Sequence, residues 1–265
     1  MQVSANGINF VCQIDGPESA PWLTFSNSLN TNFSLWDEQV ALLSDRYRVL
    51  RYNTRGHDGT GTPPGPWSLE DLASDIIALW DELGIAKSHF VGLSIGGMTG
   101  QALALGWPDR ISAYVLADTR ADFTGEFAQT VPALIDKVVA EGLDPLVAVM
   151  PLRWFAEEVR AARPELVERA RQLIATNTVE GYVACAGAMT RLDYMDRLHK
   201  IEHRTLLICG AQDIGTPPDG MREMAKRIPN ATYVEIDPAG HLSNIENPVA
   251  FNAALIPFLD SFQAP

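Results

Sequence analysis

Short runs of apolar residues, separated by polar and glycine-rich stretches, recur along most of the chain. Residues 8–14 (INFVCQI) alternate between apolar and polar positions, which predicts a strand with one buried face. Further runs are almost continuously apolar, as expected for strands buried on both faces of a parallel sheet. They span residues 22–26, 47–52, 88–93, 111–117, 204–210 and 232–236.

Helical spacing occurs between these runs. In residues 69–83 the apolar side chains recur every three or four positions. Ser68 stands where an N-cap is expected, and Gly84 follows as a stop signal. Strands that alternate with helices predict an α/β fold with a doubly wound, mostly parallel sheet.

The alternation breaks in residues 120–198, which contain helical patterns such as VPALIDKVVAEG but no convincing strand. Strands and helices alternate again from about residue 204. We therefore predict a core formed by residues 1–119 and 199–265, with residues 120–198 inserted as a helical cap. Such a cap is expected over the carboxyl edge of the sheet, where open α/β sheets bind their ligands.

Composition narrows the possible partners. The chain has 265 residues, of which 46% are hydrophobic, and a formal net charge of −13, which disfavours nucleic acid and anionic membranes. No apolar run is long enough to span a membrane, and the N-terminus lacks a signal-peptide pattern, so a cytoplasmic protein is expected. Cys12, Cys185 and Cys209 are scattered, and we expect them to be buried and unpaired.

A serine between glycines ends one apolar run, in the segment FVGLSIGGMTG of residues 90–100. Gly92, Ser94 and Gly96 match the pattern G-x-S-x-G, with a predicted strand before them and a predicted helix, residues 95–106, after them. In that setting the serine stands on a strained turn, beside free N–H groups that favour negative charge. The alternative is a loop serine bonded to its own backbone. The flanking strand and helix favour Ser94 as a nucleophile.

A serine nucleophile needs a histidine base that is itself oriented by a carboxylate, in the chain order serine, acid, histidine. Asp213 and His241 follow the last two predicted strands, in the segments GAQDIGTPP and PAGHLSNIENP. Both loops are expected at the same edge of the sheet as Ser94. We therefore predict a triad of Ser94, His241 and Asp213. A purely turn-forming Asp213, with Asp118 as the acid, is the alternative.

The other histidines are weaker candidates for catalysis. His57 lies in a glycine-rich loop and His89 within a predicted strand. His199 and His203 match the zinc-protease pattern H-x-x-E-H, but they abut a strand and have no evident third ligand. We interpret this pair as exposed linker residues and expect neither a metal nor a cofactor.

Acyl transfer also requires N–H donors for the oxyanion that develops. The N–H of Ile95, directly after Ser94, is the first candidate. The second donor is expected in the loop after residues 22–26, which reads NSLNTNFSLW. Without such a role, this loop would be an ordinary polar turn before a helix near Trp36.

Together these residues resemble the α/β-hydrolase superfamily over nearly the whole chain. The segments that are similar to the 3-oxoadipate enol-lactonases in particular are SNSL (26–29), RYNTRGH (51–57), RWF (153–155), EGYVACAGAM (180–189) and HLSNIENP (241–248). The resemblance implies an eight-stranded, mostly parallel sheet with a helical cap. It also implies that the Leu29 N–H is the second oxyanion donor, and that Asn27, Ser28 and Trp154 contact the substrate.

The activity that the resemblance implies is hydrolysis of a 3-oxoadipate enol-lactone from the degradation of aromatic compounds. Such a lactone is anionic, so Arg153 or Arg191 of the cap is expected to bind its carboxylate, unless each is a solvated surface residue. Asn30 stands where the family usually has glycine, and residues 53–60 depart from the family pattern. The alternatives are a general carboxylesterase, a hydrolase of C–C bonds and a ligand receptor with a slow triad. A small lactone or ester is the expected partner, and a homo-oligomer is left open.

Overall fold

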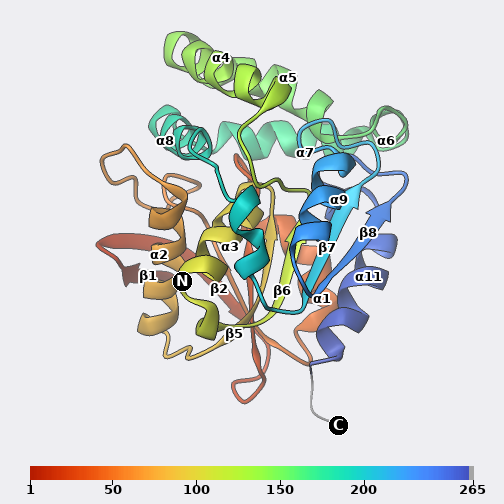
Figure 1. Ribbon diagram of the computed structural model, residues 1–265. Helices are drawn as coiled ribbons and strands as arrows, with labels where there is room; N and C mark the ends of the chain where they lie inside the picture. The colour runs from red at the N-terminus through yellow and green to blue at the C-terminus, as the bar shows by residue number, and fades with distance from the viewer. Residues whose placement is uncertain (263–265) are drawn as a thin grey trace.

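A sheet of eight strands forms the centre of the computed structural model, which describes residues 1–262 (Figure 1). The strands are β1 (Gln2–Ala5), β2 (Ile8–Asp15), β3 (Trp22–Ser26), β4 (Arg48–Tyr52), β5 (Ser88–Leu93), β6 (Ile111–Ala117), β7 (Thr205–Gly210) and β8 (Ala231–Ile236). Their order across the sheet is β1-β2-β4-β3-β5-β6-β7-β8. β2 pairs antiparallel with both β1 and β4, and every other pair is parallel, which confirms the predicted sheet.

Every predicted run forms a strand, and no end differs by more than one residue from the prediction. β1 was not predicted. Its four residues alternate between exposed and buried positions, and they pair with β2 at the edge of the sheet. So short a segment has little periodicity of its own, and its strand conformation depends on that pairing.

Helices cover both faces of the sheet. Figure 1 shows α2 (Leu69–Glu82), α3 (Ile95–Gly106) and α9 (Pro218–Arg227) on the near face, with α1 (Asp37–Leu43) and α11 (Pro248–Asp260) on the far face. Shorter elements complete the core: η1 (Phe33–Trp36), η2 (Pro108–Arg110), η3 (Met195–Lys200) and α10 (Ser243–Glu246). Ser68 caps α2 as predicted, since its hydroxyl accepts from the Asp71 N–H at 3.1 Å and its own N–H donates to the Asp71 carboxylate at 2.8 Å.

A separate layer of helices connects β6 to β7. It consists of α4 (Gly125–Glu141), α5 (Asp144–Trp154), α6 (Glu157–Ala162), α7 (Pro164–Ala175) and α8 (Val179–Met189), which lie above the sheet in Figure 1 and are called the cap here. The ends of the segment meet, since the Tyr194 N–H donates to the Ala121 carbonyl at 2.8 Å and Asp122 forms a β-bridge with Asp193. The chain therefore leaves and re-enters the core at one place.

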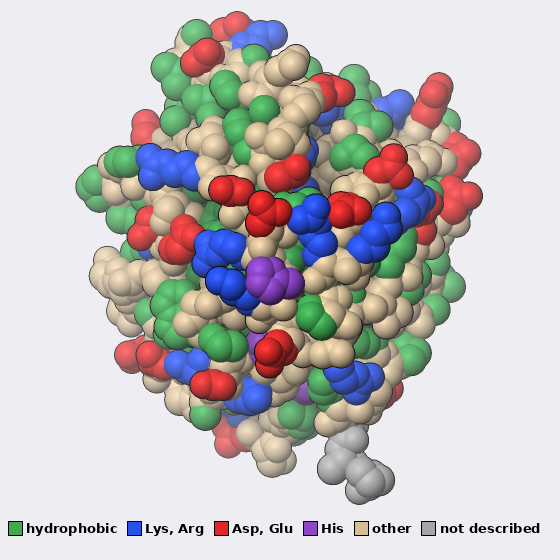
Figure 2. All heavy atoms as spheres, viewed as in Figure 1, with side chains coloured by type: hydrophobic (Ala, Val, Ile, Leu, Met, Phe, Trp, Pro, Cys, Tyr) green, Lys and Arg blue, Asp and Glu red, His purple; other side chains and the backbone are tan. Residues whose placement is uncertain are grey.

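Burial follows the pattern of the sequence. Every residue of β5 and β7 is buried, which explains why these strands are nearly continuous apolar runs. Figure 2 shows acidic and basic side chains mixed along the boundary between cap and core on the face in view. Among the described residues, no helix combines the length and the apolar character needed to cross a membrane.

Candidate active site

Ser94 occupies the turn between β5 and α3. Its φ of 57° and ψ of −118° lie outside the regions that L-residues ordinarily adopt, as predicted for a strained turn. A Cβ at position 92 would lie 2.3 Å from the carbonyl oxygen of Gly96, so the turn requires glycine there. The surroundings hold the strained conformation, since the Ser94 N–H donates to Ala117 at 3.0 Å and the Thr119 hydroxyl donates to the Ser94 carbonyl at 2.7 Å.

The three side chains of the predicted triad meet above the carboxyl ends of β5, β7 and β8. The Nε2 atom of His241 lies 2.9 Å from the Ser94 Oγ, and its Nδ1 atom lies 2.8 Å from Asp213 Oδ2. All three residues are buried. In the tautomer protonated at Nδ1, the imidazole donates to the carboxylate and accepts from the serine hydroxyl. That arrangement can remove a proton from Ser94.

Charge and burial act in opposite directions on this pair. Burial lowers the pKa of His241, but the charge of Asp213 and the hydrogen bond to it raise that pKa above its ordinary value of 6.5. Burial raises the pKa of Asp213, but the charge of His241 and hydrogen bonds from His241 and Thr216 outweigh it, so the Asp213 pKa is lowered overall. The lowered pKa favours an ionised Asp213 carboxylate beside the imidazole.

The loop after β7 fixes the position of Asp213. Its Oδ1 accepts from the N–H groups of Gly215 at 2.7 Å and Thr216 at 3.0 Å, and its Oδ2 accepts from the Thr216 hydroxyl at 2.6 Å. The same hydroxyl lies 3.3 Å from His241 Nδ1. Thr216 was not identified from sequence, although a threonine three positions after an aspartate is a known signature of local side-chain bonding. Asp213 thus shapes its turn and also contacts the imidazole.

Asp118, the alternative acid, holds two loops instead. It is fully buried with a φ of 42°, and its Oδ1 accepts from the Gly210 N–H at 2.8 Å. Its Oδ2 accepts from the Ser243 N–H at 3.1 Å and the Ser243 hydroxyl at 2.6 Å. Burial and the nearby charge of Asp213 raise the pKa of Asp118 to about 8. Asp213 is therefore the carboxylate that contacts His241.

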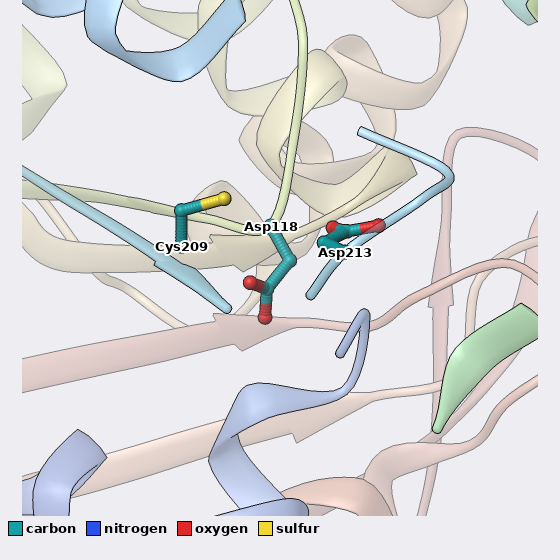
Figure 3. A group of neighbouring side chains, drawn as sticks. All are labelled: Asp118, Cys209 and Asp213. Atoms are coloured by element: carbon teal, nitrogen blue, oxygen red, sulfur yellow. The ribbon is translucent and has the colours of Figure 1, made fainter. Parts of the chain in front are cut away.

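Asp118, Cys209 and Asp213 form a buried cluster whose possible ligand atoms lie within 4.8 Å of one another, with Asp118 between the other two (Figure 3). Such a group could in principle hold a metal ion. However, the carboxylate oxygens face N–H and O–H donors from Gly210, Ser243 and Thr216. Burial also raises the pKa of the Cys209 thiol, which disfavours the thiolate that binds metals. These two carboxylates are therefore better suited to holding neighbouring loops by hydrogen bonds than to binding a cation.

The candidate oxyanion donors lie on two segments that pack closely. A Cβ at Gly96 would lie 2.4 Å from the Ser26 carbonyl oxygen, so the start of α3 touches the end of β3. This contact brings the loop after β3 to Ser94, and Leu29 lines the same cavity as Ser94. Within residues 1–262, the N–H groups of Leu29 and Ile95 have no hydrogen-bond acceptor. Both groups are therefore free to donate to a substrate oxygen.

A cavity lies between Ser94 and the cap. Ser28, Leu29, Arg153 and Trp154, which are among the candidate site residues, line it. Most of its wall is apolar, with Phe127, Val131, Met150, Trp154, Tyr182 and Met189 contributed by α4, α5 and α8. The mostly apolar wall suits a small organic ligand.

Two expected substrate contacts lie outside this cavity, which corrects the sequence analysis. The Asn27 side chain is buried, where it donates to the Tyr52 carbonyl at 2.7 Å and accepts from Trp36 Nε1 at 3.0 Å. Arg191 is exposed after the end of α8 and lines a separate groove beside Trp67. Neither residue lines the cavity beside Ser94.

His57 lies beneath the candidate oxyanion loop. Its Nε2 accepts from the Asn30 N–H at 3.2 Å, and its Nδ1 lies 3.1 Å from the Arg55 carbonyl oxygen. Burial lowers the pKa of His57, so the neutral ring fits this pair of contacts. His57, which the sequence places in a glycine-rich loop, thus bonds to the backbone of Asn30, the residue after Leu29.

The remaining histidines lie away from the site. His89 Nδ1 accepts from the Ala113 N–H at 3.1 Å inside the sheet. His199 is exposed, as expected. His203 is half-buried, with its Nε2 2.8 Å from the Pro108 carbonyl oxygen, so the expectation of an exposed residue was wrong there. Its packing against the η2 segment could not be seen from local sequence.

Known proteins with similar sequences and structures agree with this architecture. The family profile of the α/β hydrolase fold matches residues 21–248. The chain is 40% identical over 241 residues to 3-oxoadipate enol-lactonase 2 of Acinetobacter baylyi, covering 91% of this chain and 89% of the relative.

Solved structures of other proteins also superpose closely on this chain. The enol-lactonase from Burkholderia xenovorans LB400 superposes with a TM-score of 0.94 at 37% identity, covering 98% of this chain and 100% of the other. A thermophilic esterase from Thermogutta terrifontis gives a TM-score of 0.92 at 28% identity, with coverage of 100% and 99%. The chain therefore belongs to the α/β hydrolase fold family, in its enol-lactonase-like branch, and is a hydrolase that acts on ester bonds.

Proposed function

We propose that this chain opens a lactone ring by acyl transfer through Ser94, with a 3-oxoadipate enol-lactone as its substrate. The observation that carries the proposal is the placement of His241, with Nε2 2.9 Å from the Ser94 hydroxyl and Nδ1 2.8 Å from the Asp213 carboxylate. Hydroxyl, imidazole and carboxylate in this order are what serine-based acyl transfer requires. The similarity to two enol-lactonases supports the choice of substrate.

The first half of the reaction forms an acyl-enzyme. The Ser94 Oγ attacks the lactone carbonyl carbon while His241 Nε2 takes the hydroxyl proton. The tetrahedral intermediate then breaks the ring C–O bond, and the imidazolium returns the proton to the leaving enol oxygen. The enol tautomerises to a ketone, which makes ring opening favourable.

Water completes the cycle. His241 accepts a proton from a water molecule as the water oxygen attacks the acyl carbon. The bond to the Ser94 Oγ breaks, the proton passes from His241 to that oxygen, and the product leaves as a carboxylic acid that ionises by losing its proton to water. The N–H groups of Leu29 and Ile95 stabilise the oxyanion in both halves, each by roughly 10²–10³ in rate.

Arg153 is the proposed partner of the substrate carboxylate. Its side chain is 25% exposed at the cavity wall, and its guanidinium nitrogens lie 3.4 Å from the Glu126 carboxylate, which is 74% exposed. A contact this long with a solvated group is weak, so a substrate carboxylate can replace it.

A general carboxylesterase is the second candidate function. The mostly apolar wall of the cavity favours it, because such a wall also accepts uncharged acyl groups. The similarity to a thermophilic esterase points the same way. The two candidates differ in whether a negative charge on the substrate helps or hinders turnover.

The experiment compares a 3-oxoadipate enol-lactone with p-nitrophenyl acetate, using the wild type, Ser94→Ala and Arg153→Gln. We expect a much higher kcat/KM for the lactone. Ser94→Ala should abolish turnover of both substrates while leaving the melting temperature nearly unchanged, since it removes only the nucleophilic oxygen. Arg153→Gln should raise KM for the lactone alone.

Arg191→Gln is the matched control, because that arginine is exposed and outside the cavity. It should leave both KM values unchanged. Full activity in Ser94→Ala would refute the nucleophile, and a preference for the acetate would favour the esterase. Tight binding of the lactone without any turnover would point to a receptor.

A further inference from the structure

Glu246, at the end of α10, is a buried carboxylate outside the proposed triad and is 6% exposed. Its Oε1 accepts from the Gly240 N–H at 2.8 Å, and its Oε2 accepts from the Ala156 N–H at 2.9 Å. Gly240 directly precedes His241, whereas Ala156 belongs to the cap, between α5 and α6. One carboxylate thus joins the histidine loop to the cap.

The same two segments also touch each other through their backbones. The His241 N–H donates to the Trp154 carbonyl at 2.6 Å. A Cβ at Gly240 would lie 2.6 Å from that carbonyl oxygen and 3.1 Å from the Ala156 nitrogen, so only glycine allows the approach. The cap therefore rests directly on the backbone of the proposed base.

This contact has consequences for the cavity. Arg153, Trp154 and His241 all line the cavity. A shift of the cap segment 154–156 would displace the wall and the imidazole together. Because Glu246 bonds to both segments at once, it limits how far either can move without the other.

We propose that Glu246 is a positioning residue that holds the substrate-binding wall of the cap and His241 as one unit. A substrate seated against Arg153 and Trp154 then also aligns the imidazole with Ser94. This inference rests on the proposed function. Glu246 does not touch the reacting atoms and acts through the Gly240 and Ala156 N–H groups.

The charge of Glu246 also acts on the base. Burial raises the pKa of Glu246 to about 7, so an ionised carboxylate is costly here and its N–H donors offset part of that cost. The other charged groups nearby are Asp213 and Asp118 beside the imidazole, and Arg163 of the cap, which donates to two backbone carbonyls at the end of α10. The charge of Asp213, and those of Asp118 and Glu246 when these carboxyl groups are ionised, oppose the effect of burial and raise the pKa of His241. Removing the Glu246 charge should therefore lower that pKa.

The test uses Glu246→Gln, which keeps the side-chain volume but places an NH₂ group against one backbone N–H. We expect kcat to fall for both the lactone and p-nitrophenyl acetate, by roughly ten- to a hundredfold, because the imidazole is misplaced. KM should rise mainly for the lactone, which reaches Arg153. The acid limb of the kcat/KM profile should move to lower pH, and Glu246→Asp, which keeps the charge, should restore its position.

Tyr194→Phe is the matched control for a loosened cap. Its hydroxyl donates to the Glu70 carboxylate at 2.6 Å, where the cap returns to the core, and it does not line the cavity. This variant should lose stability but keep kcat, KM and the pH profile. If Glu246→Gln also changes only the melting temperature, Glu246 has a structural role alone and the inference is wrong.

A readout without turnover separates this inference from the proposed function. A wild type that hydrolyses neither substrate would refute the proposed function. The pKa of the His241 imidazole, followed by NMR and assigned with a His241→Asn variant, should still be lower in Glu246→Gln than in the wild type. An unchanged imidazole pKa would overturn the inference in either case.

Discussion

Two buried aspartates near one imidazole differ in their roles because they differ in their partners. Asp213 Oδ2 lies 2.8 Å from His241 Nδ1, whereas Asp118 accepts from the N–H of Gly210 and from Ser243. The first carboxylate favours the imidazole tautomer that is protonated at Nδ1. The second ties the end of the strand that leads to Asp213 to a residue that follows His241.

This difference predicts unequal effects of two conservative changes. Asp213→Asn should lower kcat by roughly 10³–10⁴, because an amide favours the wrong imidazole tautomer. Asp118→Asn should lower the melting temperature, because an amide can accept from only one of the two loops, and should leave kcat within about tenfold of the wild type. Steady-state kinetics and thermal unfolding of both variants test this. A larger loss of kcat in Asp118→Asn would show that the acid was misassigned.

The loop after β3 and the loop after β4 form one bonded unit. The Asn53 carboxamide accepts from the Phe33 N–H at 2.9 Å, and the Asn32 side chain donates to the Asp58 carboxylate at 2.8 Å. The Asn30 N–H donates to an imidazole from the second loop at 3.2 Å. Asn30, Asn53 and Asp58 are among the positions at which the sequence departs from the family pattern. These hydrogen bonds hold the two loops together.

Asn30 itself is the strained member of this unit. Its φ is 63°, its side chain is fully buried, and neither polar atom of its carboxamide has a partner among the described residues. Asn30→Gly should therefore raise the free energy of unfolding by about 1 kcal/mol, since it removes unpaired buried groups and relieves the backbone. Urea denaturation measures the change. A decrease would instead indicate that a buried water molecule satisfies the carboxamide.

At the scale of the whole molecule, the net negative charge disfavours the approach of an anionic substrate to the cavity. The chain carries a formal net charge of −13, yet the proposed substrate is an anion that must reach Arg153. A second hollow adjoins the cavity, and acidic side chains outnumber basic ones in its wall. Its charged members are Arg120, Asp122, Glu126, Arg153, Asp219 and Glu223. An anion that enters by this route meets a negative potential before it meets the guanidinium.

Salt should therefore assist the anionic substrate. Raising the ionic strength from about 10 mM to about 150 mM shortens the screening length from about 30 Å to about 8 Å and should increase kcat/KM for the lactone. The value for p-nitrophenyl acetate should not change, because that substrate is neutral. Kinetics at several salt concentrations test this. A decrease for the lactone would show that attraction by Arg153 outweighs repulsion by the rest of the surface.

The sequence alone determined the elements of the core and the residues of the candidate triad. Strands such as 88–93 and 111–117 could be predicted to the residue because strands buried on both faces leave continuous apolar runs. Ser94, Asp213 and His241 could be identified because each follows a strand, and the carboxyl ends of parallel strands share one edge. These signals are local, or they follow from chain order.

Only the tertiary structure decided which side chains touch. In the structure Arg153 lines the cavity, whereas Arg191 lies outside it. The imidazole of His241 contacts Asp213 and not Asp118. Glu246 accepts a hydrogen bond from the cap. The edge strand β1 also depends on its neighbour. Each of these outcomes is a contact between segments far apart in the chain, and a contact of that kind leaves no periodic pattern in the sequence on either side.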